Sequence, residues 1–385
     1  MDKLFFTDEH IMIRNMVREF ADTEITPVAR DLDEQGEFPT ALVNKMGELG
    51  LMGILIPEEY GGSGLDMVAF ATAIIELARA DASVAITMAA HTSLGSLPIL
   101  MFGSDEQKNT YLPKLATGEM LGAFGLTEPD AGSDAGATKT KAVRDGNEYV
   151  VNGGKIFITN AGKAGVLSFT SQVIENGKNL GIAAFSISTN TPGLEIGPKE
   201  KKMGWRASDT RQLFFKDMRI QATSMLGTPA NGFKTFLKTL TSGRVSIGAL
   251  SIGTALGAYE RALAYSTERI AFGKPINNFQ SVGFKLADMA TKIEASKLLV
   301  FHAAWMKDQG LDITKEAAMA KLFASETAME VTTEAIQIHG GYGYVKEYDV
   351  ERFFRDAKIL EIGEGTSEIQ RLIISREILK EIQIL

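Results

Sequence analysis

The chain of 385 residues contains no cysteine. Without thiols it can form neither disulfides nor thiolate metal sites, and it has no cysteine nucleophile. None of its four histidines lies at a metal-ligand spacing, so we expect no metal site. Lys and Arg number 40 against 48 Asp and Glu, a net charge of −8. Because phosphate binding requires clustered positive charge, this balance argues against a nucleic-acid-binding protein.

Three common catalytic and nucleotide-binding motifs are also missing. The sequence has no phosphate-binding P-loop, no G-x-G-x-x-G fingerprint and no G-x-S-x-G nucleophile elbow. The first residues, MDKLFFTDEH, are partly acidic and lack the apolar core of a secretory signal. We therefore expect a cytoplasmic, bacterial-type protein without a targeting segment.

One uncharged stretch, Ala82–Ser104, is long enough to cross a bilayer. Gly95 and Pro98 interrupt it, and its apolar residues occur in short clusters. The pattern favours a buried helix, a break around Gly95–Pro98 and a second helix. We expect no membrane span.

Hydrophobic periodicity divides the chain into three parts, and we expect domains at 1–121, 122–228 and 229–385. The middle part has short β-prone runs, including a predicted hairpin around Asn152–Gly153. The last part has helical periodicity over residues 233–240, 244–270, 281–309, 315–339 and 366–382. The pattern predicts an α+β protein with a helical domain, a β-sandwich or barrel, and a helical bundle.

Small and polar residues gather in four clusters, at 125–136, 155–162, 337–344 and 361–371. Each cluster alone is typical of a solvated, glycine-rich loop. Together, and with the run Arg269–Gln280, they resemble the acyl-CoA dehydrogenase family of flavoproteins, over Asp8–Arg371. The similarity is to the short-chain, butyryl-CoA-dehydrogenase-like members.

The resemblance implies a fold and an assembly. The family has an N-terminal helical domain, a central β-barrel or sandwich domain and a C-terminal four-helix bundle. It usually forms a homotetramer, built as a dimer of dimers. The implied role is in fatty acid metabolism, with FAD as cofactor, acyl-CoA as substrate and an electron-transfer flavoprotein as partner.

The implied reaction is dehydrogenation of an acyl-CoA thioester to the trans-2-enoyl-CoA. Glu364 matches the base that removes the Cα proton, while flavin N5 takes the hydride from Cβ. A carboxylate suits this role if an apolar surrounding raises its pKa. Some relatives place the base immediately before the arginine that Arg244 matches. Gly243 stands there in this chain, which supports Glu364.

The resemblance also assigns FAD contacts in both the β part and the last helical part. Arg269 suits a diphosphate because its guanidinium can donate two parallel hydrogen bonds. The family shares some of these contacts between neighbouring subunits. The matching residues are Phe124, Leu126, Thr127, Phe157, Thr159, Arg269, Phe272, Gln280, Gln337, Gly341, Thr366 and Glu368.

The resemblance also implies substrate contacts, from Ser133 and Arg244 at the CoA end and from Gly365 beside the thioester. Two positions depart from the family pattern. Thr241 stands where an aspartate is frequent, which puts an adenine contact in doubt. Gly363 stands where a tyrosine often precedes the base, and the missing ring predicts room for a short-chain, branched or cyclic acyl group.

Other functions remain open on the same fold. They are an acyl-CoA oxidase, an enoyl-CoA reductase and an inactive acyl-CoA-binding protein. Retention of Glu364 weakens the last of these. A nucleic-acid-binding member of the superfamily is disfavoured by the charge.

Overall fold

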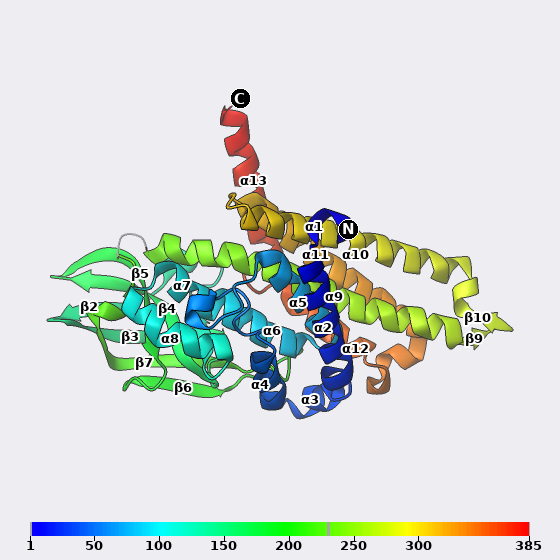
Figure 1. Ribbon diagram of the computed structural model, residues 1–385, viewed down its shortest axis with the longest axis horizontal. Coiled ribbons are helices and arrows are strands. Elements are labelled where there is room, and N and C mark those ends of the chain that lie inside the picture. Colours follow the sequence, from blue (N-terminus) through cyan, green and yellow to red (C-terminus); the bar gives the residue numbers. More distant parts are fainter. Residues whose placement is uncertain (1, 229–231, 385) are drawn as a thin grey trace.

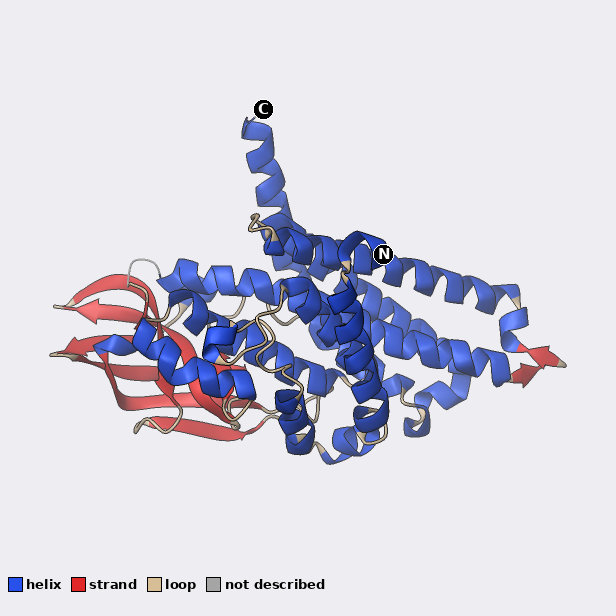
Figure 2. Ribbon diagram, viewed as in Figure 1, coloured by secondary structure: helices blue, strands red, loops and turns tan. Residues whose placement is uncertain are grey.

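The computed structural model describes residues 2–228 and 232–384. The described chain forms helices first, strands in the middle and helices again at the end (Figure 2), which confirms the α+β fold class. Figure 1 shows an elongated molecule with the sheet at one end and long helices running away from it. The predicted boundary after residue 228 adjoins residues 229–231, which lie outside the described residues. The three domain ranges therefore remain predictions.

The first part is a layered group of helices around α5 and α6. Every residue of α6 is buried, and so is nearly all of α5, so both are hydrophobic on all sides. Asp81 separates them, and its carboxylate accepts from the Val84 N–H at 2.9 Å as an N-cap. The helices are α1 (Asp2–Phe5), α2 (Asp8–Phe20), α3 (Ala29–Gln35), α4 (Thr40–Glu48), α5 (Met67–Ala80), α6 (Ala82–Ala90), α7 (Leu97–Phe102) and α8 (Asp105–Thr117).

The uncharged stretch is helical from Ala82 to Phe102, so the predicted break at Gly95–Pro98 is wrong. A π-helix, His91–Ser96, joins α6 to α7. A Cβ on Gly95 would lie 2.6 Å from the Cα of Gly122, so this glycine permits close packing and does not form a turn. Within the described residues this is the one helix long and apolar enough to cross a membrane, and 83% of the window concerned is buried inside the protein.

The middle part is one sheet whose strand order is β6-β7-β3-β2-β4-β5-β8 in the described chain, with β1 paired in parallel to β4. Aromatic rings fill its core, with Phe169 and Phe185 at 5.6 Å between centroids. The strands are β1 (Leu121–Gly125), β2 (Lys141–Asp145), β3 (Glu148–Thr159), β4 (Ala164–Glu175), β5 (Lys178–Ser188), β6 (Leu194–Lys199), β7 (Thr210–Gln221) and β8 (Met225–Leu226).

The hairpin predicted at Asn152–Gly153 is wrong, because β3 continues through it. The register with β7 shifts between Val151 and Gly153, as in a β-bulge. Gly153 has a φ of 144°, and a Cβ there would lie 2.5 Å from the Thr140 hydroxyl oxygen. The glycine thus serves a bulge and a close approach. The reversal before β3 occurs instead at Gly146, whose φ is 59°.

The last part is a helical bundle in which α9 packs against α5, α10 and α11. The two helices predicted for residues 233–240 and 244–270 are one continuous helix, α9 (Gly232–Glu268). A small hairpin, β9 (Ile270–Ala271) and β10 (Lys274–Pro275), follows at the end remote from the sheet (Figure 1). The remaining helices are α10 (Gln280–Asp308), α11 (Thr314–His339), α12 (Val350–Ala357) and α13 (Ser367–Ile384).

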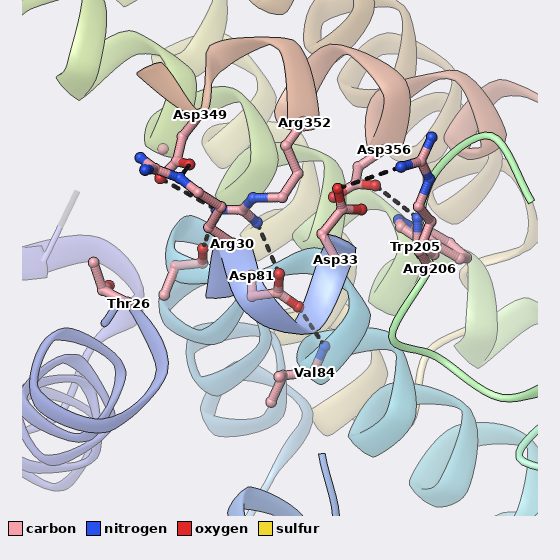
Figure 3. A network of polar contacts seen from close by, with 12 residues as sticks. Thr26, Arg30, Asp33, Asp81, Val84, Trp205, Arg206, Asp349, Arg352 and Asp356 are labelled. Carbon is pink, nitrogen blue, oxygen red and sulfur yellow. Dashed lines mark hydrogen bonds and ion pairs between the residues drawn. The ribbon is translucent and has the colours of Figure 1, made fainter. Parts of the chain in front are cut away.

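A buried polar network joins the three parts (Figure 3). Arg352 of α12 pairs with Asp81 at 2.7 Å, and both side chains are almost fully buried. Asp356 accepts from the Trp205 N–H at 2.6 Å, which anchors the segment between β6 and β7. Because unpaired charges are costly in a protein interior, these contacts fix the positions of the three parts relative to one another.

Candidate active site

Glu364 lies in the loop between a 3₁₀ turn, Lys358–Glu361, and α13. Its φ is 52°, a left-handed value that is strained for a residue with a Cβ, and Gly365 follows with a φ of 95°. The side chain turns inward, and Oε2 is buried. No group among the described residues donates a hydrogen bond to that oxygen. A strained backbone thus presents a carboxylate oxygen whose hydrogen-bonding capacity is unused.

Gly243 of α9 lies directly against this carboxylate. A Cβ at Gly243 would be 2.0 Å from Oε2 of Glu364, so a glycine is required for the side chain to lie as it does. The resemblance to the family gave two alternative positions for the base. The fold brings the two positions together, although they come from different helical segments.

The surroundings of Glu364 alter its acidity. Burial raises its pKa to about 7, against the opposing influence of the Lys321 and Arg244 cations. A group with this pKa is partly ionised at neutral pH and can both accept and release a proton there.

Sequence reasoning missed two residues that hold this loop. The ammonium of Lys321, on α11, donates to the Gly365 carbonyl at 2.8 Å. The amide of Gln370, on α13, donates to the same carbonyl at 2.8 Å and to the Glu364 carbonyl at 3.3 Å. A lysine on a helix face otherwise lined by alanines was the available signal for Lys321.

The predicted flavin contacts of the middle part lie at two neighbouring strand ends. Phe124 is on β1, and Leu126 and Thr127 follow its last residue, half-buried. The N–H of Ile156 donates to the Thr127 carbonyl at 2.9 Å, so the end of β1 lies beside β3. Phe157 and Thr159 are therefore close to that segment in the fold.

Beneath these strand ends is a second feature that sequence reasoning missed, a buried ion pair. Lys155 is fully buried and donates to Glu128 at 2.7 Å and to the Leu126 carbonyl at 3.1 Å. The Glu128 carboxylate also accepts from the Lys139 N–H at 2.6 Å and from the Thr138 hydroxyl. The alternation of β3, which points Lys155 inward, was the available signal.

Two predicted FAD residues of the last part, Arg269 and Gly341, line one cavity of about 500 Å³ at the far end of the bundle. The Arg269 guanidinium lies 5.5 Å from the centroid of the Tyr342 ring. Gln337 lies at the end of α11, near this cavity in sequence, and Gln280 begins α10. Phe272, at the hairpin tip, is 95% exposed with a φ of 50°.

The predicted FAD residues of the last part form two groups. Thr366 and Glu368 stand next to Glu364 and are called the Glu364 group. The Arg269 group, at the far end of the bundle, consists of Arg269, Phe272, Gln280, Gln337 and Gly341. Arg244 lies near Glu364 in the first half of α9, and Arg269 directly follows the last residue of that helix. At 1.5 Å per residue, the two arginines are about 38 Å apart along the axis of α9.

The predicted CoA contacts are likewise dispersed. Ser133 is exposed in the loop after β1, whereas Arg244 is buried on α9. The Arg244 guanidinium donates to the Thr241 hydroxyl at 3.3 Å, so the departure at Thr241 retains a polar contact. Thr366 and Glu368 stand at the start of α13, next to Glu364 in sequence. In the described residues no cluster of His, Asp or Glu is suited to a metal ion.

Comparison with known proteins identifies the class. Models of the acyl-CoA dehydrogenase N-terminal, middle and C-terminal domains match residues 7–119, 123–218 and 230–379. The chain belongs to the acyl-CoA dehydrogenase family, and it is an oxidoreductase of CH–CH bonds.

Three relatives place it more narrowly. It is 54% identical to "Probable acyl-CoA dehydrogenase YngJ" of Bacillus subtilis, over 97% of this chain and 99% of that protein. It is 46% identical to the short-chain-specific acyl-CoA dehydrogenase of Clostridium acetobutylicum, over 97% and 99%. It is 47% identical to an acryloyl-CoA reductase (NADH) of Anaerotignum propionicum, over 97% and 95%. The chain is thus similar to short-chain, butyryl-CoA-dehydrogenase-like members.

Solved structures agree with the three-part fold. Butyryl-CoA dehydrogenase from Megasphaera elsdenii superimposes with a TM-score of 0.94 at 43% identity, covering 97% of this chain and 98% of that one. A structure named for the electron transferring flavoprotein of Acidaminococcus fermentans gives 0.94 at 45% identity, over 97% and 98%. An acyl-CoA dehydrogenase complexed with FAD from Bacillus anthracis gives 0.93 at 37% identity, over 98% and 68%.

FAD is the cofactor of this enzyme family, and this chain's residues fit it. The Phe157 ring is 64% exposed at a strand end, as suits an apolar ring that stacks on a planar ligand. Gly340 and Gly341 leave open space, because no described heavy atom lies within 4 Å of where their Cβ atoms would stand. Arg269 lines the same cavity and suits a diphosphate.

Proposed function

We propose that this protein catalyses the α,β-dehydrogenation of an acyl-CoA thioester to the trans-2-enoyl-CoA. In this reaction the Cα–H bond loses its proton to the Glu364 carboxylate, and the Cβ–H bond loses a hydride. FAD, when bound, supplies the two-electron acceptor for that hydride. The two electrons then pass to an electron-transfer flavoprotein, a partner supported by the similar structure that is named for such a protein.

The observation that carries the proposal is the state of Glu364. Its Oε2 is buried, lacks a donor among the described residues, and belongs to a carboxyl group whose pKa is raised to about 7. A carboxylate with satisfied hydrogen bonds and a low pKa would be a poor base for a weakly acidic Cα proton. This carboxylate is suited to take that proton at neutral pH.

The remaining site residues have proposed roles in binding. Thr127, Thr159 and the backbone after β1 would hold the flavin ring, with Phe124, Leu126 and Phe157 around it. Arg269, Phe272, Gln280, Gln337 and Gly341 would hold the diphosphate and adenine, and Thr366 and Glu368 the adenosine ribose. Ser133 and Arg244 would hold the CoA end, and Gly365 would let the thioester lie against the backbone.

For the acyl group we propose a short, branched or cyclic chain. The space before the base supports this, because a Cβ on Gly363 would meet nothing closer than the Ile359 carbonyl oxygen at 3.4 Å. The name of the Clostridium acetobutylicum relative supports a short chain. Flavin bleaching by a panel of straight, branched and alicyclic acyl-CoAs would rank them.

For assembly we propose a homotetramer, a dimer of dimers in which FAD sites are shared between chains. The separation of the Arg269 group from the Glu364 group supports sharing, and so does the exposed Phe272 ring. The helix α13 projects from the body (Figure 1). It carries exposed apolar side chains, Leu372, Ile378, Leu379 and Ile382. Sedimentation of the yellow protein should therefore yield a dimer or larger, and a stable FAD-loaded monomer would contradict sharing.

The test of the reaction is Glu364→Gln, which keeps the size of the side chain but cannot accept the proton. Flavin reduction by acyl-CoA, followed by stopped-flow absorbance, should slow by about 10²–10⁴-fold or more. FAD content and acyl-CoA binding should persist. The matched control is Glu106→Gln at an exposed position of α8, which should reduce at the parental rate. Reduction by Glu364→Gln within tenfold of the parent would mean that another group takes the proton.

A second candidate function is enoyl-CoA reduction, favoured by 47% identity to a protein named acryloyl-CoA reductase (NADH). The same carboxyl group would then donate the proton to Cα, since its pKa near 7 permits either direction. Anaerobic turnover with enoyl-CoA and a reduced electron carrier, compared with turnover of acyl-CoA, distinguishes the two directions. Rapid reoxidation of the reduced protein by oxygen would instead indicate an oxidase.

A further inference from the structure

Lys321 is a fully buried lysine in the middle of α11. Its buried neighbours on that helix include Ala317, Ala320 and Ala324. Removing a charge from water is costly unless the charge is compensated. The charge of Lys321 must therefore be compensated by the groups that its ammonium contacts.

The ammonium group of Lys321 points at the active-site loop. It donates to the carbonyl of Gly365 at 2.8 Å, which is the peptide group that follows Glu364. Glu364 has a left-handed backbone, and such a conformation persists only where the surroundings hold it. The contact with Lys321, together with that from Gln370, holds the Gly365 carbonyl in place.

We propose that Lys321 is the positioning residue of the base. Its ammonium group fixes the Gly365 carbonyl and thereby the direction of the Glu364 side chain. This inference rests on the proposed function of Glu364. Nothing in the reaction requires Lys321 to touch the substrate.

Charged groups on α9, α11, α13 and the preceding 3₁₀ turn act on the loop. Arg244 on α9 and Lys321 on α11 are the cations that act on Glu364. Burial lowers the pKa of Lys321 to about 8, and Arg244 acts in the same direction, whereas the carboxylates of Glu364, Glu361 and Glu368 oppose this fall. Burial raises the pKa of Glu364 and the two cations oppose that rise. Removing one cation therefore favours the neutral acid and raises the pKa further.

The experiment compares Lys321→Met with the parent protein. Methionine keeps the apolar stem but removes both the charge and the hydrogen bond. The rate of flavin reduction at low acyl-CoA concentration should rise with pH in both proteins. In Lys321→Met the midpoint should shift upward by about one pH unit, and the plateau rate should fall by about tenfold because the base is less well oriented.

Two controls separate charge from structure. Lys321→Arg restores the charge and should bring the midpoint back towards the parental value. Lys114→Met makes the same change on the surface of α8 and should leave the profile unchanged. A readout independent of turnover is the infrared carbonyl band of the protonated Glu364 side chain, assigned by its loss in Glu364→Gln. Its pH titration should show the same upward shift in Lys321→Met.

The outcomes separate the positioning role of Lys321 from the role of Glu364 as the base. If Glu364→Gln is inactive but Lys321→Met titrates at the parental midpoint in both measurements, the positioning role of Lys321 is wrong. If Glu364→Gln still reduces flavin at the parental rate, the assignment of the base itself is wrong. A shifted midpoint with full FAD content in Lys321→Met supports the inference.

Discussion

Two buried glutamates, each near a buried lysine, have opposite properties in this protein. Lys155 donates directly to the Glu128 carboxylate at 2.7 Å, whereas Lys321 donates to the backbone carbonyl next to Glu364 at 2.8 Å. Burial acts to raise the pKa of both carboxyl groups. Lys155 and nearby hydroxyl groups hold the pKa of Glu128 down at about 2, while the pKa of Glu364 rises to about 7.

The comparison indicates that the direction of a lysine's hydrogen bond decides what a buried carboxylate can do. At Glu128 the donors satisfy the carboxylate, so it remains ionised and holds the strand ends proposed to contact FAD. At Glu364 the donors hold the backbone and leave one carboxylate oxygen without a donor among the described residues. The first arrangement serves stability, and the second keeps a carboxyl group available for proton transfer.

The largest effect that would test this comparison concerns the Glu128 pair. Lys155→Met removes the cation that pairs with the buried Glu128 carboxylate and should lower the free energy of unfolding by about 3–5 kcal/mol. Chemical denaturation measures the loss. The double variant Glu128→Gln/Lys155→Met removes both charges and should recover much of it. A double variant as unstable as the sum of the two single ones would contradict the pairing argument.

The next effect concerns the space beside Glu364. In Gly243→Ala the new methyl group would lie 2.0 Å from Oε2, so the flexible carboxylate must move. Because small misplacements of reacting groups are costly, flavin reduction should slow by about 10²-fold while the fold persists. Gly283→Ala on α10, where a Cβ has room, is the control. Equal stopped-flow rates in parent and Gly243→Ala would show that the carboxylate does not need this space.

The smallest effect concerns pH. With the pKa of Glu364 raised to about 7, the base is protonated and inactive below that pH and ionised above it. At low acyl-CoA concentration, the rate of flavin reduction should therefore fall about tenfold per unit below pH 7 and level off above it. Glu128 stays ionised over this range and should not contribute. A profile that is flat across pH 7 would contradict the raised pKa.

The order of helical and β parts was predictable, because hydrophobic periodicity reports local structure directly. Glycines are harder to interpret. The sequence predicts that Gly95 and Gly153 interrupt elements, but each lies within a continuous one where another chain segment approaches closely. A glycine that permits a close approach cannot be distinguished from one that permits a turn by its neighbours in sequence alone.

Short contiguous segments were enough to indicate the family, because each motif is local in the chain. Through the resemblance, they also indicated Glu364 as the base and the motifs that match FAD contacts. The packing of distant segments was needed to show that Gly243 adjoins Glu364 and that the Arg269 group lies far from it along α9. It was also needed to show that Lys321 donates to a carbonyl and Lys155 to a carboxylate. Both are buried lysines, and which acceptor lies within reach of each ammonium group depends on residues remote in the sequence.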